Sequence, residues 1–468
     1  MLSFSPFNFF PIILISIVGL LLLINNRKLA ITQSLIFGIS FFTFGIYWIY
    51  ICLQKFGGMP AIMAIVFTLM LCAFLSLFFL PLALFNRHKT KIFFIPALFT
   101  LSEWLRSFIF TGFPWLSLGY SQVPESSLSG YLPIIGIHGI TFLVILSAIL
   151  IFRLLKKDSD KKIILLISLI AIWLGGQILK NIEWTESSGK TFSATLIQGN
   201  ITQDKKWDNN MINESLDRYT QLISKSNSSL VILPETSIPI TLEQIPEKFL
   251  NNIKNQMIHV NGNVILGAIE RKNNDFYNSA FSIGVDTKQI YRKYHLVPFG
   301  EFIPLRKYLG YIYKNWLNIP FNNLSQGPKK PLPINLNGQY IGINICYEDV
   351  FGNEITNQLP TANILVNMSN DAWYGASIAA SQHLQISQAR AIETGRMMLR
   401  ATNTGVTAFI DVNGKVIKAL PQFKTASLTH NIQGYRGSTP YVILGNYPLI
   451  ILCFLILIIP ILKKLIYK

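Results

Sequence analysis

Long runs of apolar residues with almost no charges constrain the fold of this chain more than any other feature. Each run is close to the roughly 20 residues with which a helix crosses a bilayer, and hydrophobic residues make up 51% of the 468-residue sequence. We therefore predict seven membrane-spanning helices, over Phe9–Ile24, Leu29–Ile51, Ala61–Phe85, Ile92–Phe110, Tyr131–Phe152, Ile163–Leu179 and Val442–Leu462.

The fourth run is the weakest of these candidates. Glu103 and Arg106 lie inside it, and charges at membrane depth are costly unless they face protein or a polar cavity. Their i, i+3 spacing places both side chains on one face of a helix. We therefore expect the two residues to form a mutual ion pair.

The apolar runs divide the chain into three predicted parts. Residues 1–182 form an N-terminal transmembrane bundle of about six helices, residues 191–438 have the composition of a globular domain, and residues 439–468 form a C-terminal transmembrane helix with a basic tail. By the positive-inside rule every second loop is cytoplasmic, because the basic residues gather there: Arg27, Lys28, Arg87, Lys89, Lys91, Arg153, Lys156, Lys157, Lys161, Lys162, Lys463, Lys464 and Lys468. The globular part then faces the opposite side.

The charge and the cysteine and histidine content exclude several classes of protein. The formal net charge is +17, and most of the excess lies outside residues 191–440, so it indicates membrane orientation rather than a nucleic-acid partner. Cys346 is the only cysteine in the globular part, which rules out a disulfide within it. The six histidines show no metal-ligand spacing, so we predict neither a metal nor another cofactor.

Short apolar strands alternate with helical stretches in the globular part. The pattern predicts helices near 209–224, 245–260 and 379–394, and strands over 193–200, 230–235, 263–270, 278–285, 288–297, 339–346, 362–369 and 405–417. Such alternation predicts an α/β sandwich with a mixed sheet. In sheets of this kind polar side chains gather at strand ends, and three residues stand there: Glu235, Lys293 and Cys346.

These three residues are together sufficient for acyl transfer through a covalent intermediate. A thiol needs a base or a nearby cation for activation, and the Glu235 carboxylate can accept its proton. The Lys293 ammonium can stabilise the thiolate and then the oxyanion that forms when a carbonyl is attacked. Taken singly, each residue has an ordinary structural explanation: a small buried thiol, a surface carboxylate and a solvated lysine. Their sequence surroundings favour the catalytic interpretation.

Those surroundings resemble the nitrilase superfamily of Glu-Lys-Cys amidases and acyltransferases and, within it, the apolipoprotein N-acyltransferase family. LPETSIP, YRKYHLVPFGEFIP and CYEDVF are similar to the segments that carry the family's general base, lysine and nucleophile. QGNITQDKKWD, SNDAWYG, QHLQISQARAIETGR and LRATNTGVTAFID resemble further segments, and EWLRSFIFTGFPWLSLGYSQ resembles one that soluble nitrilases lack. The resemblance implies a polytopic α-helical membrane bundle plus a nitrilase-like αββα sandwich, with Glu235, Lys293 and Cys346 as catalytic residues.

The resemblance also implies roles for neighbouring residues. Glu301 is the second acid that orients the lysine, and Trp207 stands at the family's tryptophan position. Glu348 positions substrate or supports the catalytic lysine, while Tyr347 lines the acyl pocket. Asp349 has no implied role, and we interpret it as a charge at a helix N-terminus.

The implied activity is transfer of a fatty acyl chain from a membrane phospholipid, through a cysteine thioester, to the α-amine of the diacylglyceryl-cysteine at a lipoprotein N-terminus. The family implies phosphatidylethanolamine as donor and a multi-pass position in the bacterial inner membrane, with the catalytic domain on the periplasmic side. The family usually has one more span ahead of FNFFP, so either this protein lacks that first helix or the recorded start is late.

An aromatic segment, residues 309–327, lies between Glu301 and Cys346. We predict that it dips into the membrane or covers the site, with Tyr313, Trp316 and Phe321 as lipid contacts; the alternative is a loop packed on the globular domain.

Two rival functions stay open at this point. The first is a membrane-anchored amidase of the nitrilase type, which would pass the acyl group to water. The second is a transporter or receptor with an extracytoplasmic binding domain, which predicts polar residues or broken helices at mid-membrane. Only Glu103 and Arg106 come close to that pattern.

Overall fold

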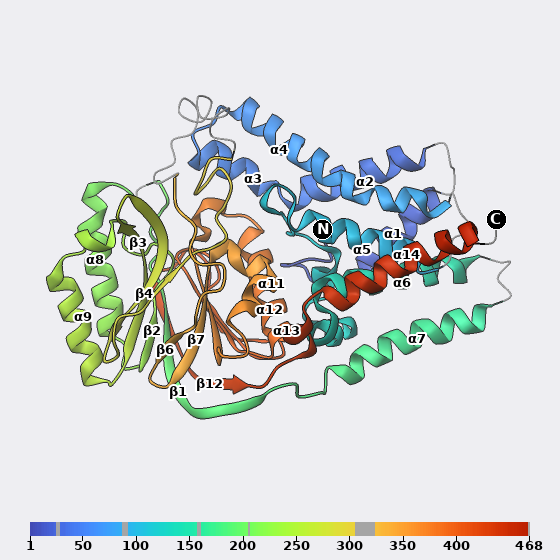
Figure 1. The fold of residues 1–468 in the computed structure, drawn as a ribbon. Coiled ribbons are helices and arrows are strands. Elements are labelled where there is room, and N and C mark those ends of the chain that lie inside the picture. Colours follow the sequence, from blue (N-terminus) through green and yellow to red (C-terminus); the bar gives the residue numbers. More distant parts are fainter. Residues whose placement is uncertain (25–28, 87–91, 157–160, 205, 305–322, 467–468) are drawn as a thin grey trace. The chain divides into compact units, whose positions relative to one another are not determined.

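The structure is a computed structural model that describes residues 1–24, 29–86, 92–156, 161–204, 206–304 and 323–466 (Figure 1). The chain divides into two compact units. The first contains Met1–Tyr47, Ile62–Glu183 and Thr439–Lys468, and the second contains Trp48–Ala61 and Trp184–Ser438.

Each of the seven predicted spans contains a helix in the structure. The helices are α1 (Pro11–Leu23), α2 (Ala30–Gly45), α4 (Ala61–Ser76), α5 (Phe94–Arg106), α6 (Leu132–Leu155), α7 (Lys162–Leu179) and α14 (Tyr447–Ile466). Within the described residues, three are long and apolar enough to cross a membrane, with bounds of Ala61–Phe85, Ser127–Leu155 and Lys162–Leu179. A fourth span results if Ala30–Gly45 and Trp48–Phe56 are counted as one broken helix.

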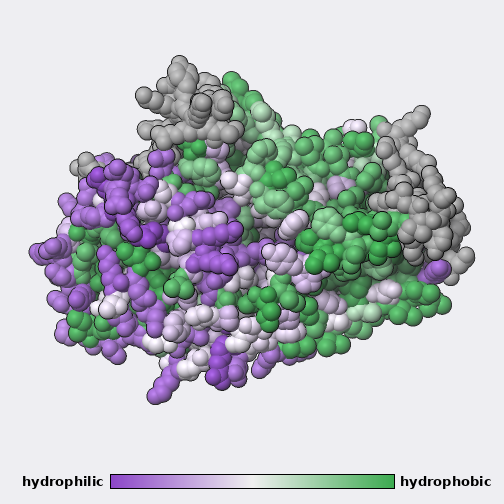
Figure 2. Space-filling view, in the orientation of Figure 1, coloured by the Kyte–Doolittle hydropathy of each residue, from purple (hydrophilic) through white to green (hydrophobic). Residues whose placement is uncertain are grey.

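The exposed surface of the first unit is largely apolar. Ile163, Ile167, Leu174 and Ile178 are all exposed on α7, and Figure 2 shows hydrophobic surface along this helix. Lipid tails are as apolar as these side chains, so exposure in a bilayer costs them nothing. Over α8 (Asn209–Ser224) and α9 (Glu247–His259) of the second unit, by contrast, the surface is mostly hydrophilic (Figure 2).

The expected pair of Glu103 and Arg106 is confirmed. Both side chains are buried, and Arg106 Nη2 lies 3.7 Å from Glu103 Oε1. Glu103 also accepts hydrogen bonds from the Leu118 backbone N–H (2.9 Å) and Thr141 Oγ1 (2.7 Å). Arg106 donates to the carbonyl oxygen of Trp115 at 2.8 Å. The pair is therefore tied to the neighbouring backbone, as a buried charge requires.

Two six-stranded sheets form the second unit. The first has the order β12-β1-β2-β3-β4-β5, with bounds Ala426–Arg436, Glu186–Gln198, Leu230–Ile232, Asn263–Lys272, Asp275–Gly284 and Ile290–Arg292. The second has the order β11-β10-β9-β8-β7-β6, with bounds Val416–Ala419, Ala408–Ile410, Met398–Thr402, Ile364–Ser369, Gln339–Ile345 and Ile334–Leu336. In each sheet three neighbouring strands run parallel, namely β1, β2 and β3 in the first and β7, β8 and β9 in the second. All other neighbouring strands are antiparallel.

Apolar layers hold the two sheets and their helices together. One cluster fills the space between the sheets and includes Leu196, Ile232, Ile343, Val366 and Leu399. A second cluster packs α8 and α9 against the first sheet, and a third packs α11 (Gly352–Ile355) and α12 (Ala379–Thr394) against the second sheet (Figure 1). The predicted αββα sandwich is therefore confirmed.

One segment that we predicted as the end of a span and a loop belongs to the second unit. Helix α3 (Trp48–Ile51) and a π-helix (Cys52–Phe56) follow a break after α2, so the single helix predicted over Leu29–Ile51 is wrong. Cys52 Sγ donates to the Trp373 carbonyl at 3.1 Å. The Trp48 and Tyr374 rings are in edge contact, with their centroids 4.8 Å apart. Hydropathy missed this break because the two helices together are still apolar enough for a membrane span.

Candidate active site

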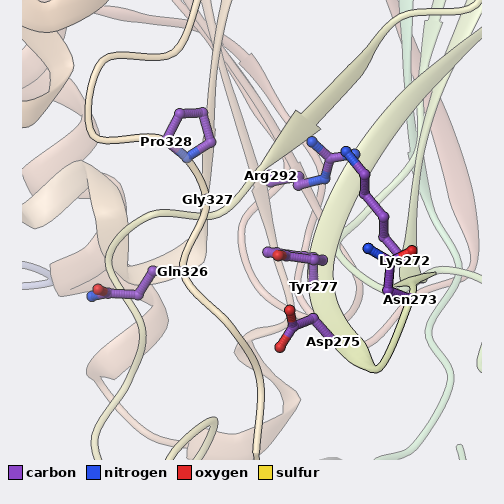
Figure 3. Close-up of a pocket in the computed structure, with 8 residues that line it drawn as sticks. All are labelled: Lys272, Asn273, Asp275, Tyr277, Arg292, Gln326, Gly327 and Pro328. Atoms are coloured by element: carbon purple, nitrogen blue, oxygen red, sulfur yellow. The ribbon is translucent and has the colours of Figure 1, made fainter.

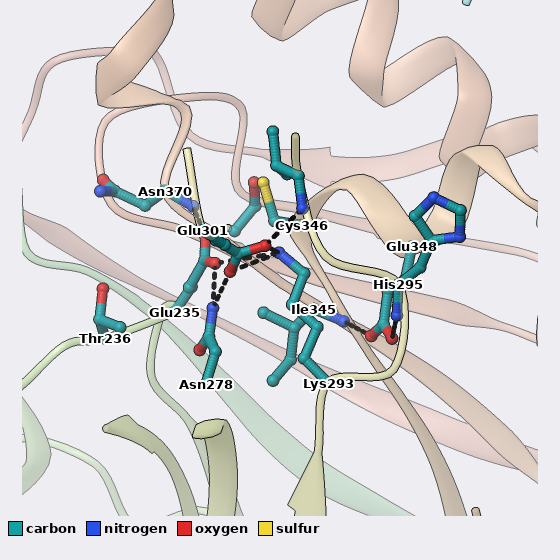
Figure 4. A network of polar contacts seen from close by, with 12 residues as sticks. Glu235, Thr236, Asn278, Lys293, His295, Glu301, Ile345, Cys346, Glu348 and Asn370 are labelled. Carbon is teal, nitrogen blue, oxygen red and sulfur yellow. Dashed lines mark hydrogen bonds and ion pairs between the residues drawn. The ribbon is translucent and has the colours of Figure 1, made fainter. Parts of the chain in front are cut away.

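The three predicted catalytic residues come from the ends of three strands that the sandwich brings together. Glu235 lies just after β2, Lys293 directly follows β5, and Cys346 directly follows β7 on the facing sheet. All three side chains are buried, with exposed fractions of 8%, 1% and 7%. In Figure 4 Lys293 and Glu235 point toward each other beside Cys346.

Lys293 is held between two carboxylates. Its Nζ lies 2.9 Å from Glu301 Oε2 and 3.6 Å from Glu235 Oε1. Asn278 Nδ2 bridges the two acids, donating to Glu235 Oε1 (2.8 Å) and Glu301 Oε1 (2.7 Å). Burial alone would lower the pKa of Lys293, but the charges of Glu301 and Glu235 outweigh burial and raise it above the ordinary value. Lys293 is therefore a fixed cation, and Glu301 lies where an acid that orients it would lie.

Glu235 is fixed by backbone as well as by side chains. Its Oε2 accepts a hydrogen bond from the Asn370 N–H at 2.9 Å. The next residue, Thr236, has φ +41°, a conformation that costs energy for a β-branched residue. The turn packs closely against Gly267, where a Cβ would lie 2.6 Å from the Thr236 nitrogen. Strain of this kind persists only where surrounding contacts hold the backbone.

Cys346 stands at a strained turn between β7 and a 3₁₀ helix (Cys346–Val350). Its φ is +54°, in the left-handed region. Burial raises the pKa of the Cys346 thiol and the charge of Glu235 raises it further, while Lys293 acts in the opposite direction. The resting sulfur therefore carries its proton and needs a base when it reacts. Glu235 and Glu301 both contact Lys293, but the contact of Glu235 is the longer one, at 3.6 Å against 2.9 Å. Glu235 is therefore the carboxylate that is better able to accept the thiol proton.

The family of the chain follows from comparison with known proteins. The carbon-nitrogen hydrolase model matches residues 193–441, and the model of the apolipoprotein N-acyltransferase N-terminal domain matches residues 1–150. An apolipoprotein N-acyltransferase from Nitrosomonas europaea is 42% identical over 457 residues, which cover 95% of this chain and 91% of that protein. The chain belongs to the apolipoprotein N-acyltransferase family.

Other relatives of the same name agree. The apolipoprotein N-acyltransferase from Chromobacterium violaceum is 36% identical, over 98% of this chain and 91% of that protein. The one from Ralstonia nicotianae is also 36% identical, over 96% of this chain and 88% of that protein. The family predicted from the sequence segments is therefore confirmed.

Asp349 belongs to a buried charge network rather than to a helix N-terminus alone. His383 bonds Asp349 Oδ1 through Nε2 and Asp371 Oδ1 through Nδ1, each at 2.9 Å. Burial and Arg400 lower the pKa of His383, but Asp349 and Asp371 outweigh them and raise it. Arg400 contacts both acids, at 3.3 Å for Asp349 and 2.9 Å for Asp371. Our interpretation of Asp349 as a helix-terminal charge is therefore incomplete.

This network also contacts the predicted nucleophile, Cys346, of this apolipoprotein N-acyltransferase family member. His383 Nε2 lies 3.2 Å from the Cys346 carbonyl oxygen, which also accepts a hydrogen bond from Asn367 Nδ2 at 3.0 Å. The sequence analysis assigned no role to His383, Arg400 or Asn367. His383 and Arg400 stand within the QHLQISQAR and LRATNTG segments, which is the signal that could have identified them.

Glu348 ties together the strand ends that carry the lysine and the cysteine. Its Oε2 accepts from the Ile345 N–H (2.7 Å) and the Tyr291 hydroxyl (2.8 Å). Its Oε1 accepts from the N–H groups of Tyr294 (2.7 Å) and His295 (3.1 Å). Burial raises the pKa of Glu348 to about 7, against the attraction of Lys293. With both oxygens engaged by the protein, the geometry favours support of the lysine over contact with substrate.

The remaining predicted residues have varied surroundings. The Tyr347 ring is in edge contact with the Phe351 ring, and the two centroids are 5.2 Å apart. Trp207 is half-buried and packs against a small apolar cluster of Ile269, Leu296 and Leu324. Their roles stay predictions, and Tyr313, Trp316 and Phe321 lie outside the described residues. Across the described ranges no group of three or more His, Cys, Asp or Glu side chains could hold a metal ion.

Proposed function

We propose that this protein transfers a fatty acyl group from a membrane phospholipid, through a thioester on Cys346, to the α-amine of an N-terminal diacylglyceryl-cysteine in lipoproteins. The name shared by its relatives supports the acyl transfer and the lipoprotein acceptor. The observation that carries the chemistry is the buried Lys293, held between Glu235 and Glu301 next to a buried thiol.

The first half-reaction breaks the donor ester. Glu235 takes the proton of the Cys346 thiol while the sulfur attacks the ester carbonyl carbon. Lys293 stabilises the negative charge that develops on the carbonyl oxygen. When the tetrahedral intermediate collapses, the carbon–oxygen bond breaks and the lysophospholipid leaves with the proton held by Glu235. The acyl group then remains on sulfur as a thioester.

The second half-reaction makes the amide. The α-amine of the acceptor attacks the thioester carbonyl, and Lys293 again stabilises the oxyanion. Glu235 accepts a proton from the attacking nitrogen, the carbon–sulfur bond breaks, and the departing thiolate recovers that proton. The fatty acyl chain leaves as an amide, and the resting thiol is restored.

Phosphatidylethanolamine is the donor that the family suggests, and the bacterial inner membrane is the expected location. The basic residues gather in every second loop, which supports a periplasmic position for the second unit. Enzymatic transfer of the acyl group to water is the alternative, since a membrane-anchored amidase would use the same three residues. The names of the relatives do not favour it.

Supplying both lipids to the purified protein tests this function. Phosphatidylethanolamine with a labelled acyl chain and a synthetic diacylglyceryl lipopeptide with a free α-amine are expected to give labelled lipopeptide amide and lysophospholipid in equal amounts. The same lipopeptide with an acetylated α-amine serves as control and should remain unlabelled. Labelled free fatty acid with no labelled lipopeptide would contradict transfer and indicate hydrolysis.

A further inference from the structure

A second buried lysine lies beside the general base and has no part in the steps above. Lys206 is 1% exposed. Its Nζ donates a hydrogen bond to Thr236 Oγ1 at 2.6 Å and another to the Glu235 carbonyl oxygen at 3.3 Å. Unlike Lys293, it has no carboxylate at ion-pairing distance among the residues that the structure describes. An ammonium carries three donors, and two of them point here at the Glu235–Thr236 turn, while the Trp207 ring centroid lies 6.0 Å from Nζ.

The turn to which Lys206 donates its hydrogen bonds is the strained turn that carries Glu235. Thr236 has φ +41°, and the side chains of Glu235 and Thr236 are seen on the same turn in Figure 4. Gly267 supports the turn from one direction, where Ser237 Oγ also donates to the Gly267 carbonyl at 3.1 Å. Lys206 supplies the bond to the Thr236 hydroxyl. A strained backbone stays in place only when contacts such as these over-determine it.

Lys206 also brings charge to the site. Burial lowers the pKa of Lys206 to about 8, although the charges of Glu235 and Cys346 act in the opposite direction. The residue is therefore a cation at neutral pH and loses its proton in mildly alkaline solution. Among the described residues, Glu301 and Glu348 also act on Lys293 and Asp371 acts on Cys346, while the charges of Cys346 and Glu235 act on the buried Tyr374.

We propose that Lys206 is a positioning residue for the general base: its ammonium fixes the Glu235–Thr236 turn and places a second positive charge beside the carboxylate that accepts the thiol proton. This inference rests on the proposed function, because it concerns the formation of the Cys346 thioester. It assigns Lys206 no contact with the reacting atoms.

The K206M variant removes both the charge and the hydrogen bonds. The rate of Cys346 acylation by phosphatidylethanolamine, without acceptor, is followed by intact mass from pH 5 to pH 10. We expect the rate at pH 7 to fall about ten- to a hundredfold, as for a slightly misplaced catalytic group. The acid side of the pH profile should move up by about one pH unit, because an anion that loses a neighbouring cation takes up a proton more readily.

The T236V variant keeps the charge, the β-branched shape and the strain, and removes only the hydroxyl that accepts from Lys206. A lost hydrogen bond to the charged form lowers the pKa of a lysine. We therefore expect the alkaline fall in rate, near pH 8 in the native protein as Lys206 loses its proton, to begin at lower pH in T236V. An alkaline side that coincides with that of the native protein would overturn the inference, and this test does not depend on whether K206M folds.

The K272M variant is the matched control, since it removes the same charge from an exposed lysine of β3 at the open hollow drawn in Figure 3. Its pH profile should coincide with the native one. If K206M is slower and melts at lower temperature but keeps the native pH profile, Lys206 is only structural and the inference fails. Failure of the native protein to form any acyl-enzyme would instead overturn the proposed function itself, so the two failures are distinguishable.

Discussion

Replacing Glu235 with glutamine is expected to slow acylation of Cys346 by about a hundred- to ten-thousandfold, the usual contribution of a general base. The thiol is buried and its pKa is raised, so the sulfur is rarely a thiolate without a proton acceptor. Glutamine has nearly the same shape as glutamate but cannot take the proton. The loss should therefore appear in the thioester-forming step, as measured by intact mass after rapid mixing with phosphatidylethanolamine.

The E235Q substitution should leave the fold in place. Glu235 accepts from the Asn370 N–H and from Asn278 Nδ2, and a glutamine oxygen can keep the first of these bonds. Asn278 Oδ1, which has no hydrogen-bond partner among the described residues, can accept from the new amide if Asn278 turns over. E270Q is a matched control, because it neutralises a buried acid that pairs with Arg292 instead. A rate in E235Q equal to that in E270Q would remove Glu235 from the mechanism.

Replacing Lys293 with methionine is expected to slow thioester formation strongly and to destabilise the second unit. The oxyanion loses its cation, a change worth about a hundred- to a thousandfold in rate for one donor. Glu235 and Glu301 also lose the ammonium that lies 3.6 Å and 2.9 Å from them. Breaking a buried pair in this way costs about 3–5 kcal/mol, which should be visible as a lower melting temperature in detergent.

A double variant separates the two effects of K293M. Glu301 has the shorter contact with the lysine, so K293M/E301Q removes the more strongly coupled of the two uncompensated charges. We expect the double variant to melt closer to the native protein while thioester formation stays slow. Recovery of thioester formation together with stability would mean that Lys293 only holds the fold.

The sequence was sufficient to predict that Glu235, Lys293 and Cys346 come together, because each stands where an apolar strand ends in a polar turn; their catalytic roles stay predictions. Glu301 was also identified, since it follows Lys293 in one continuous segment. Lys206, Asn278 and Asn370 were not identified. Their contacts with Glu235 depend on side-chain directions after folding, and Asn278 and Asn370 are 43 and 135 residues away from it in sequence. A strand pattern predicts where a residue stands but not which distant group it meets.

Asp349 and the segment Trp48–Ala61 were interpreted incompletely for the same reason, because their surroundings depend on residues that are distant in sequence. The charged partners of Asp349, His383 and Arg400, are 34 and 51 residues further along the chain, so local sequence offered only the charge at a helix start. The segment Trp48–Ala61 is apolar enough to extend a membrane helix, and its place in the second unit depends on contacts with Trp373 and Gln382. Glu103 and Arg106 were predicted correctly because an i, i+3 pair is settled within one helix.

The most direct test of the mechanism is the mass of the protein after incubation with phosphatidylethanolamine alone. The account predicts a gain of one acyl group in place of the thiol hydrogen, located on Cys346 by peptide mapping and absent from C346A. Addition of the diacylglyceryl lipopeptide should discharge this adduct and yield one equivalent of N-acylated product. Formation of that product by C346A, or by native protein whose acyl group sits on another residue, would contradict the account.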